Sequence, residues 1–117
     1  MGIHGETGIS RSTLASADEV ADQLLERICE DSGIDTGAKV AVLVNGLGAT
    51  PLEELYLVYR RAHAYLQERK IEIHRVFVGE YATSMEMAGL SISILELDEE
   101  LAGLLDAPFD TPFHKSF

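Results

Sequence analysis

An uninterrupted apolar run in the middle of the chain sets the strongest limit on its fold. Residues 40–44, Val-Ala-Val-Leu-Val, lack the polar alternation of a half-exposed strand, which is typical of a strand buried on both faces. Such a strand needs other elements on either side of it. The run therefore predicts a layered fold with a sheet at its centre.

An amphipathic segment with a clear start signal precedes this run. Ser16 and Glu19 have the spacing of a capping box, and apolar residues follow at helical intervals. We expect a helix from about residue 17 to 31 that stops near Gly33, because glycine commonly ends helices.

A second helix is expected after the apolar run. Thr50 and Glu53 form another capping box, with Pro51 at the first helical position. The apolar stripe that predicts the helix, to about residue 69, consists of Leu52, Leu55, Tyr56, Tyr59, Ala62 and Leu66. Residues 45–49, Asn-Gly-Leu-Gly-Ala, are then expected to form a tight connection between strand and helix.

The remaining chain predicts two more strands and a short helix. Residues 71–78 indicate a strand whose alternation breaks midway, as a bulge would cause, and residues 90–97 indicate a clearer one. Asp98 can cap a last helix, while Pro108 and Pro112 favour an extended, mobile tail. The alternation of strands and helices predicts an α/β or α+β layered sandwich with about three strands.

Size and charge exclude several classes of protein. A length of 117 residues is enough for one domain with a core, and a net charge of -11 with a pI near 4.6 argues against nucleic acid as a partner. Cys29 is the only cysteine, so no intramolecular disulfide can form and a reducing compartment is expected. No apolar run approaches the length of a membrane span and no secretory signal is present, so we expect a cytoplasmic protein without membrane attachment.

The glycines at 46 and 48 invite a comparison with a dinucleotide-binding loop. Pro51 stands where the third glycine of that fingerprint belongs, and Glu53 and Glu54 place negative charge where a phosphate would bind. A structural turn is therefore the better interpretation, and no bound nucleotide or metal is expected on this chain.

Other polar residues allow both structural and functional interpretations. His63 and His74 are more often ordinary core or surface histidines than ligands, and His114 falls in the tail. Glu80 and Glu86 flank a loop that could line a site or be a solvated connection. Met85 and Met87 fit core filling better than cofactor contacts.

His4 has the sharpest functional interpretation in the chain. It stands in Gly2-Ile3-His4-Gly5-Glu6, where the glycines permit a close approach of substrate to the backbone. A neutral imidazole can attack a carbonyl carbon, and Glu6 could accept the other ring proton and fix the tautomer. The structural alternative is a frayed, polar N-terminus.

Several segments resemble the dihydroxyacetone-binding K subunit of dihydroxyacetone kinases. They are residues 2–9, 40–56, 59–61, 83–89 with 91–92, and 104–108 with 110–112. The block NGLGATPLEELY is the most specific, because capping and turn geometry do not explain its whole spelling. The resemblance covers the chain from end to end but only the C-terminal part of the K subunit, so the family's N-terminal half is missing.

The resemblance implies an α/β fold of the type found in the C-terminal domain of the K subunit, and a role for His4. In that family the histidine of this motif holds dihydroxyacetone as a covalent hemiaminal, which implies that Gly2, Gly5 and Glu6 shape its loop.

The resemblance also implies partner subunits. ATP or ADP with Mg is implied on a partner L subunit, with a phosphotransferase-relay M subunit in some systems, and a homo-oligomer is expected. The isolated chain is expected to be inactive because the family's general base lies in the missing half. The alternative is a non-catalytic binding or regulatory module.

Overall fold

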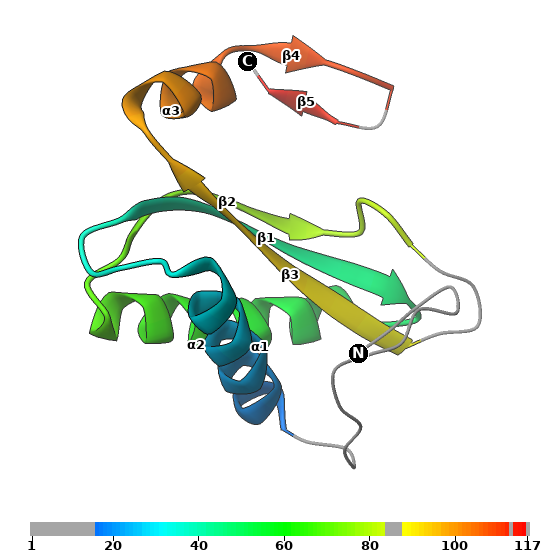
Figure 1. Ribbon diagram of the computed structural model, residues 1–117. Helices are drawn as coiled ribbons and strands as arrows, with labels where there is room; N and C mark the ends of the chain where they lie inside the picture. The colour runs from blue at the N-terminus through cyan, green and yellow to red at the C-terminus, as the bar shows by residue number, and fades with distance from the viewer. Residues whose placement is uncertain (1–15, 84–87, 113, 117) are drawn as a thin grey trace.

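The protein forms a small mixed sheet with helices on both sides. The computed structural model describes residues 16–83, 88–112 and 114–116. The elements are α1 (Ala17–Ser32), β1 (Lys39–Gly48), α2 (Leu52–Glu68), β2 (Glu72–Gly79), β3 (Ala88–Leu97), α3 (Glu99–Asp106), β4 (Phe109–Asp110) and β5 (Lys115–Ser116). The main sheet has the order β2-β1-β3, with β1 parallel to β2 and antiparallel to β3. In Figure 1, α1 and α2 lie on one side of this sheet and α3 with the β4–β5 hairpin on the other, so the predicted α/β layered architecture is confirmed.

The first helix forms where the sequence predicts it. The Ser16 side chain accepts a hydrogen bond from the backbone N–H of Glu19 at 3.3 Å, as a capping residue should. Gly33 ends the helix in the left-handed conformation, with φ of 66°, and donates its N–H to the Cys29 carbonyl. The helix α3 also begins at a side-chain cap, because an Asp98 carboxylate oxygen accepts a hydrogen bond from the backbone N–H of Leu101 at 2.7 Å.

The predicted tight connection at residues 45–49 is wrong, because β1 continues through it. The antiparallel ladder with β3 extends to the pair Gly48 and Ala88, so the Asn-Gly-Leu-Gly stretch is strand rather than turn. Gly46 packs closely against Leu55, since an added Cβ would lie 2.9 Å from Leu55 Cδ1 and would force that side chain to shift. Gly48, with φ of 66°, then turns the chain toward α2.

Thr50 is not the cap of α2, contrary to the capping-box prediction. Pro51 occupies the N-cap position without a side-chain hydrogen bond, and the helix begins at Leu52. The Thr50 hydroxyl instead donates to the Gly89 carbonyl at 2.7 Å. Its function is therefore to hold the start of β3 against the β1–α2 connection.

The bulge predicted in the second strand is confirmed. The register of β1 with β2 passes from Val40 opposite Ile73 to Ala41 opposite Arg75, so His74 is the extra residue. A bulge re-aims side chains near it. Here it brings both His74 and Arg75 to α3, as described below.

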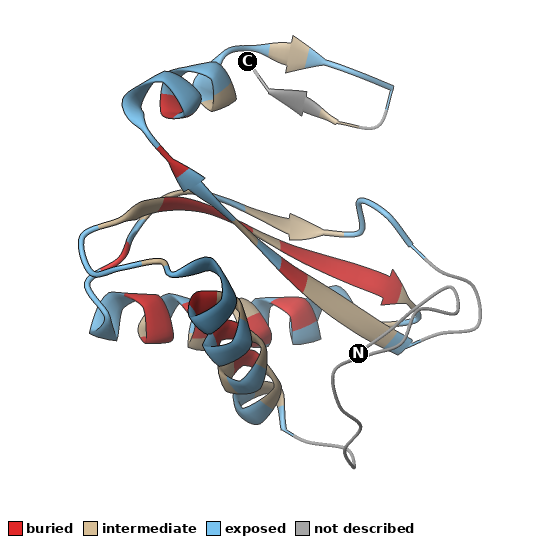
Figure 2. Ribbon diagram, in the orientation of Figure 1, coloured by how far each residue is buried: buried red, intermediate tan, exposed pale blue. Residues whose placement is uncertain are grey.

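The core lies between the sheet and the pair α1 and α2. Figure 2 shows the buried positions along β1 and along the facing sides of both helices. Its largest fully buried side chains are Leu25, Leu55, Leu66, Val40, Val42, Val44 and Val58. Arg61 on α2 donates to both carboxylate oxygens of Asp22 on α1, at 2.8 and 3.3 Å, which fixes the two helices together at the edge of this core.

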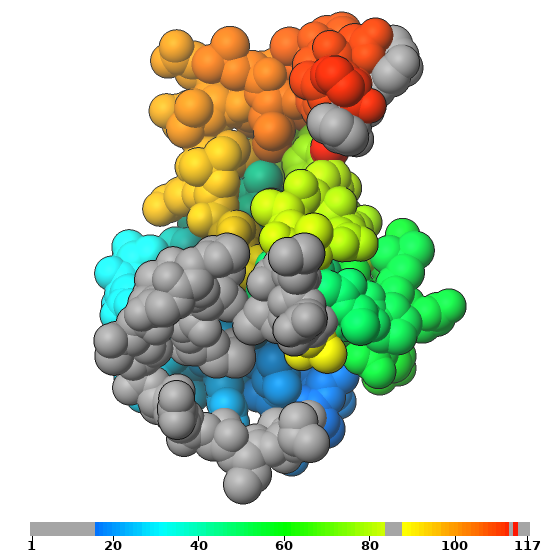
Figure 3. All heavy atoms as spheres, turned by 90° about the vertical axis from the view of Figure 1, so that its right-hand side faces the viewer, coloured from blue at the N-terminus to red at the C-terminus, as the bar shows by residue number. Residues whose placement is uncertain are grey.

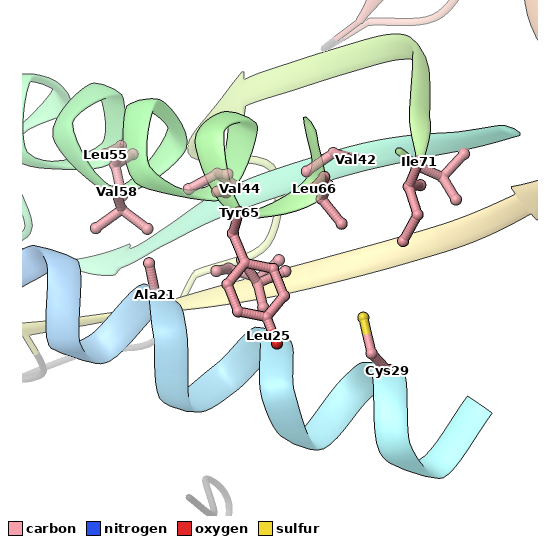
Figure 4. Close-up of a cluster of buried hydrophobic side chains, with 13 residues drawn as sticks. Ala21, Leu25, Cys29, Val42, Val44, Leu55, Val58, Tyr65, Leu66 and Ile71 are labelled. Atoms are coloured by element: carbon pink, nitrogen blue, oxygen red, sulfur yellow. The ribbon is translucent and has the colours of Figure 1, made fainter. Parts of the chain in front are cut away.

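Tyr65 places a hydroxyl in this core without a partner among the described residues. The side chain is 8% exposed, and Figure 4 shows it between α2 and α1. Burial is the main factor that raises the pKa of its phenol. The Arg69 guanidinium lies over its ring at 4.4 Å from the centroid, so the ring is held even though the hydroxyl is not.

Replacing Tyr65 with phenylalanine is expected to leave stability unchanged or to raise it by up to about 1 kcal/mol. The change removes a buried hydroxyl that lacks a hydrogen bond and keeps the ring under Arg69. Urea unfolding of the Tyr65→Phe and Tyr65→Leu variants checks this, because the leucine variant also loses the ring and should be less stable. A loss above about 1 kcal/mol in Tyr65→Phe would mean that the hydroxyl has a partner.

Candidate functional site

The residues that the sequence nominates most strongly lie outside the described ranges. His4, Gly2, Gly5 and Glu6 belong to residues 1–15, and Glu86 with Met85 and Met87 belongs to residues 84–87. Their predicted functions stay predictions. The described residues contribute the carboxyl ends of β1 and β2 and the loops that leave them, and these together are called the frame of the candidate site.

Asn45 organises that frame from inside the sheet. Its side chain is 5% exposed and accepts hydrogen bonds from the backbone N–H groups of Tyr81, at 2.8 Å, and Ala82, at 3.0 Å. Its amide nitrogen donates to the Ala82 carbonyl at 2.7 Å. Because its amide oxygen and nitrogen are both engaged, Asn45 acts as a clamp on the loop that follows β2.

Two threonines complete the connections at this end of the sheet. Thr83 Oγ1 accepts from the backbone N–H of Gly48 at 2.8 Å, which ties the same loop to the last residue of β1. Thr50 ties the other side to Gly89, as described above. In open α/β sheets, ligands bind outside the carboxyl ends of the parallel strands. The clamped loop therefore lies where this architecture places substrates.

An aromatic cluster joins this loop to the C-terminal tail. The His114 ring stacks on Tyr81 with centroids 5.1 Å apart and also contacts Phe77 at 5.4 Å and Phe109 at 4.9 Å. Partial burial raises the pKa of the Tyr81 phenol, and Tyr56 adds to the effect. In the structure His114 contacts Phe77 on β2 and Tyr81 on the loop that follows it, while the expected mobility of the tail stays a prediction.

His74 and Arg75 connect the bulge of β2 to the end of α3. His74 Nε2 and Asp106 Oδ2 are 2.8 Å apart, and Arg75 donates to Asp106 Oδ1 at 3.3 Å and to the Leu105 carbonyl at 3.2 Å. The hydrogen bond from His74 is the largest factor that lowers the pKa of Asp106, and the bond and charge of Arg75 act in the same direction. This group fastens α3 to the sheet, which agrees with the structural interpretation of His74.

His63 also has a structural explanation. It is exposed on α2, where it contacts the Tyr59 ring edge-on and lies 3.3 Å from the Gln67 amide nitrogen.

The lowered pKa of Asp106 predicts a specific loss of stability in acid. A carboxyl whose pKa is lower in the folded than in the unfolded protein stabilises the fold above the unfolded value, about 4, and that contribution is lost as pH falls through the folded pKa. Unfolding free energy measured in urea from pH 6 to pH 2.5 should fall less steeply in Asp106→Asn than in the wild type. The exposed Asp35→Asn is the control, and equal slopes for Asp106→Asn and wild type would contradict the assignment.

The described residues offer few other candidates for chemistry. Among them, no group of three or more histidine, cysteine, aspartate or glutamate side chains could hold a metal ion. Within the same residues, no helix has the length and apolar character to cross a bilayer.

The sequence of the chain matches a known domain family. The Dak1 domain matches residues 1–113, nearly the whole chain. The chain belongs to the Dak1 domain family. The Dak1 match also includes residues 2–6, so the segment that holds His4 lies inside the shared region.

Named relatives of this Dak1 chain include dihydroxyacetone-binding kinase subunits and an L-erythrulose kinase. The chain is 48% identical over 115 residues to the dihydroxyacetone-binding subunit DhaK of PTS-dependent dihydroxyacetone kinase 2 from Listeria innocua, covering 98% of this chain and 35% of that subunit. It is 35% identical to the corresponding subunit of the PEP-dependent enzyme of Escherichia coli, covering 96% of this chain and 38% of the subunit. It is also 43% identical to an L-erythrulose kinase of Pectobacterium atrosepticum, covering 96% of this chain and 20% of that enzyme. The Dak1 chain thus spans little more than a third, or less, of these relatives.

Solved structures agree with the fold and add a different activity. A structure titled dihydroxyacetone kinase operon co-activator Dha-DhaQ has a TM-score of 0.80 and 26% identity, covering 92% of this chain and 34% of that chain. Another, titled for regulation of the dha operon of Lactococcus lactis, has a TM-score of 0.81 and 27% identity, covering 92% of this chain and 34% of that chain. Proteins similar to this Dak1 chain therefore include both kinase subunits and a regulator.

Sequence reasoning overlooked Asn45 as the clamp of this Dak1 frame. Asparagine next to glycine is a common turn signal, so the sequence predicts a turn at this residue. The clue was its place at the end of an apolar run, since a polar residue that extends a buried strand needs hydrogen-bond partners of its own.

Proposed function

We propose that this chain is the substrate-binding part of a dihydroxyacetone kinase and holds the ketone covalently through His4. The observation that carries the proposal is the Dak1 match over residues 1–113, which includes the His4 segment, together with relatives named as dihydroxyacetone-binding subunits. The clamped loop at the carboxyl ends of β1 and β2 supports it, because this is where such sheets bind ligands.

The chemistry assigned to His4 is addition to the ketone. An unprotonated ring nitrogen attacks the carbonyl carbon, a nitrogen–carbon bond forms, and the carbonyl electron pair moves to oxygen. The other ring nitrogen releases its proton to Glu6 or to solvent. The former carbonyl oxygen takes up a proton by the same route, which gives a neutral hemiaminal. The tethered ketose then presents a terminal hydroxyl in a fixed orientation.

The rest of the reaction is assigned to partners. ATP or ADP with Mg is bound by an L subunit, which supplies the phosphoryl group and in some systems is recharged by an M subunit of the phosphotransferase relay. This chain binds no nucleotide or metal of its own. We further propose that the chain corresponds to the C-terminal part of the K subunit, that the N-terminal half supplies the general base, and that the complete subunit is a homo-oligomer. The chain alone, with L subunit and donor, should then form no dihydroxyacetone phosphate, and adding the N-terminal half should restore it.

Carbon-13 labelling of dihydroxyacetone tests the tether directly. With the N-terminal half present, the carbonyl resonance should move to the position of a carbon with four single bonds, and labelled glycerol should give no new signal. The adduct should weaken as pH drops through the usual range of histidine, about 6 to 7, because a protonated ring has no lone pair. A ketone resonance that stays unchanged at saturating protein would refute covalent attachment.

A regulatory module is the second candidate function. It is favoured by the fold similarity to the co-activator structure, at a TM-score of 0.80. A regulator need not turn over substrate. Phosphate formation by the completed subunit with its L subunit would therefore decide for the kinase, and adduct formation without turnover would decide for the regulator.

A further inference from the structure

Asn45 and Gly46 form a pair of neighbours that can react with each other. Asn45 is the only asparagine in the chain, so a chemical change of asparagine has a single possible location. Glycine has no Cβ, so its backbone nitrogen can approach the preceding side chain without steric obstruction. The pair therefore holds a nucleophilic nitrogen close to the amide carbon, Cγ, of the Asn45 side chain.

The reaction open to this pair is loss of the side-chain amide as ammonia. The Gly46 backbone N–H gives up its proton, its nitrogen bonds to Asn45 Cγ, and the bond from Cγ to the side-chain nitrogen breaks as ammonia leaves. Water then opens the five-membered imide at either of its carbonyl carbons, which leaves an aspartate or an isoaspartate at position 45. Because the attack is intramolecular, water is the only co-reactant.

The folded structure holds both halves of this pair away from ring closure. The oxygen and the nitrogen of the Asn45 amide are both bound to the loop after β2, at 2.7 to 3.0 Å. The backbone at Asn45 is paired with Gly79 of β2 on one side and with Ser91 of β3 on the other. Ring closure requires the side chain to rotate and the chain at Gly46 to leave its extended conformation. The clamp opposes the first change and the sheet opposes the second.

The loop that supplies the clamp is the part of this arrangement that can open. Residues 80–83 are exposed, and Figure 3 shows the yellow-green end of β2 with its loop at the surface of the molecule. Besides the clamp, the loop is tied to β1 by the hydrogen bond from Gly48 N to Thr83 Oγ1, at 2.8 Å. An exposed loop held by a few hydrogen bonds opens at a lower free-energy cost than the buried core. Asn45 is therefore freed by local opening before the protein unfolds.

We propose that Asn45–Gly46 is a deamidation site, which the clamp keeps unreactive and which opening of the loop of residues 80–83 activates. The reactivity of the pair is independent of the proposed function. An ionised aspartate at position 45 has no proton to donate to the Ala82 carbonyl. An isoaspartate also lengthens the backbone of β1 by one carbon, which breaks the register of the following residues with β3. Either product loosens the frame of the candidate site permanently.

Mass spectrometry of the 117-residue chain during incubation in mildly alkaline buffer tests the site. In urea the wild type should gain the mass difference between amide and acid at Asn45, and Gly46→Ala should gain it more slowly because a methyl group obstructs ring closure. The folded wild type should react about tenfold or more slowly than the unfolded chain, because only the open fraction reacts. Thr83→Ala should react faster than the folded wild type, and the exposed Thr36→Ala, its matched control, should not.

The urea dependence of the reaction separates loop opening from global unfolding without any substitution. Local opening exposes little surface, so the rate should change little at urea concentrations below the unfolding transition. A rate that rises as steeply as the unfolded fraction would overturn loop opening as the route, as would equal rates in Thr83→Ala and Thr36→Ala. Equal rates in the folded and the unfolded wild type would overturn protection by the clamp.

The modified protein provides the last measurement. After separation by charge, it should show faster amide exchange at Tyr81 and Ala82 than the unmodified protein does, with little change at Val42. Unchanged exchange at Tyr81 would overturn the predicted loosening of the frame. Absence of any mass gain in urea would show that the pair is unreactive and would overturn the site itself.

Discussion

Replacing His4 with alanine is expected to abolish the covalent dihydroxyacetone adduct completely. In the proposed mechanism the attacking atom is a ring nitrogen of His4, and alanine offers no nucleophile in its place. With the N-terminal half present, the labelled carbonyl should remain a ketone at every pH. Phosphate formation should fall with it, because an untethered ketose loses the orientation that the bond provides.

The described histidines provide the control for this experiment. His63 is exposed and pairs with Gln67 and Tyr59, so His63→Ala should retain the full adduct signal. Glu6→Gln should weaken the adduct without removing it, because glutamine can still hold the ring but cannot take its proton. An adduct that persists in His4→Ala would assign the tether to another residue.

Replacing Asn45 with alanine is expected to cost about 3 kcal/mol of folding free energy, the largest stability effect among the substitutions discussed. The change removes the partners of two backbone N–H groups and one carbonyl at once. Water can reach part of this loop, so the cost should lie at the low end of the sum of three desolvation penalties of about 1–3 kcal/mol each. Amide exchange at Tyr81 and Ala82 should accelerate far more than at Val42, which lies in the buried middle of β1.

Two further variants define what the Asn45 effect means. Ser93→Ala, at an exposed position on β3, removes a small hydroxyl outside the clamp and should change stability by less than about 0.5 kcal/mol. Asn45→Asp keeps the oxygen that accepts both N–H groups, but its ionised carboxyl cannot donate to the Ala82 carbonyl, so above the pKa of the new carboxyl the stability should fall between that of wild type and alanine. Unchanged exchange at Tyr81 in Asn45→Ala would show that the loop holds its conformation without the clamp.

Local signals were sufficient for much of the fold. The cap at Ser16, the stop at Gly33 and the cap at Asp98 each depend on residues within a few positions, so sequence spacing predicts them correctly. The bulge at His74 was predictable for the same reason, because an extra residue shifts the local alternation of a strand.

Long-range contacts explain the predictions that were wrong. The stretch from Asn45 to Gly48 has turn-forming residues, but pairing with β3, about 40 residues later, keeps it extended. The Thr50 hydroxyl donates to the Gly89 carbonyl and does not cap the helix that follows it. Neither partner choice can be read from neighbouring residues, since both depend on how distant segments meet.

The position of β3 at the margin of the sheet has a practical consequence for handling the protein. Among the described strands, β3 pairs only with β1, so one side of a ten-residue strand presents backbone groups that no strand covers. Such an edge is a template for intermolecular strand addition and aggregation. The exposed Glu96 and a net charge of -11 keep chains apart at neutral pH. Near the pI of about 4.6 that repulsion disappears, so we expect aggregation in mild acid to begin with β3 strands of neighbouring molecules joining edge to edge.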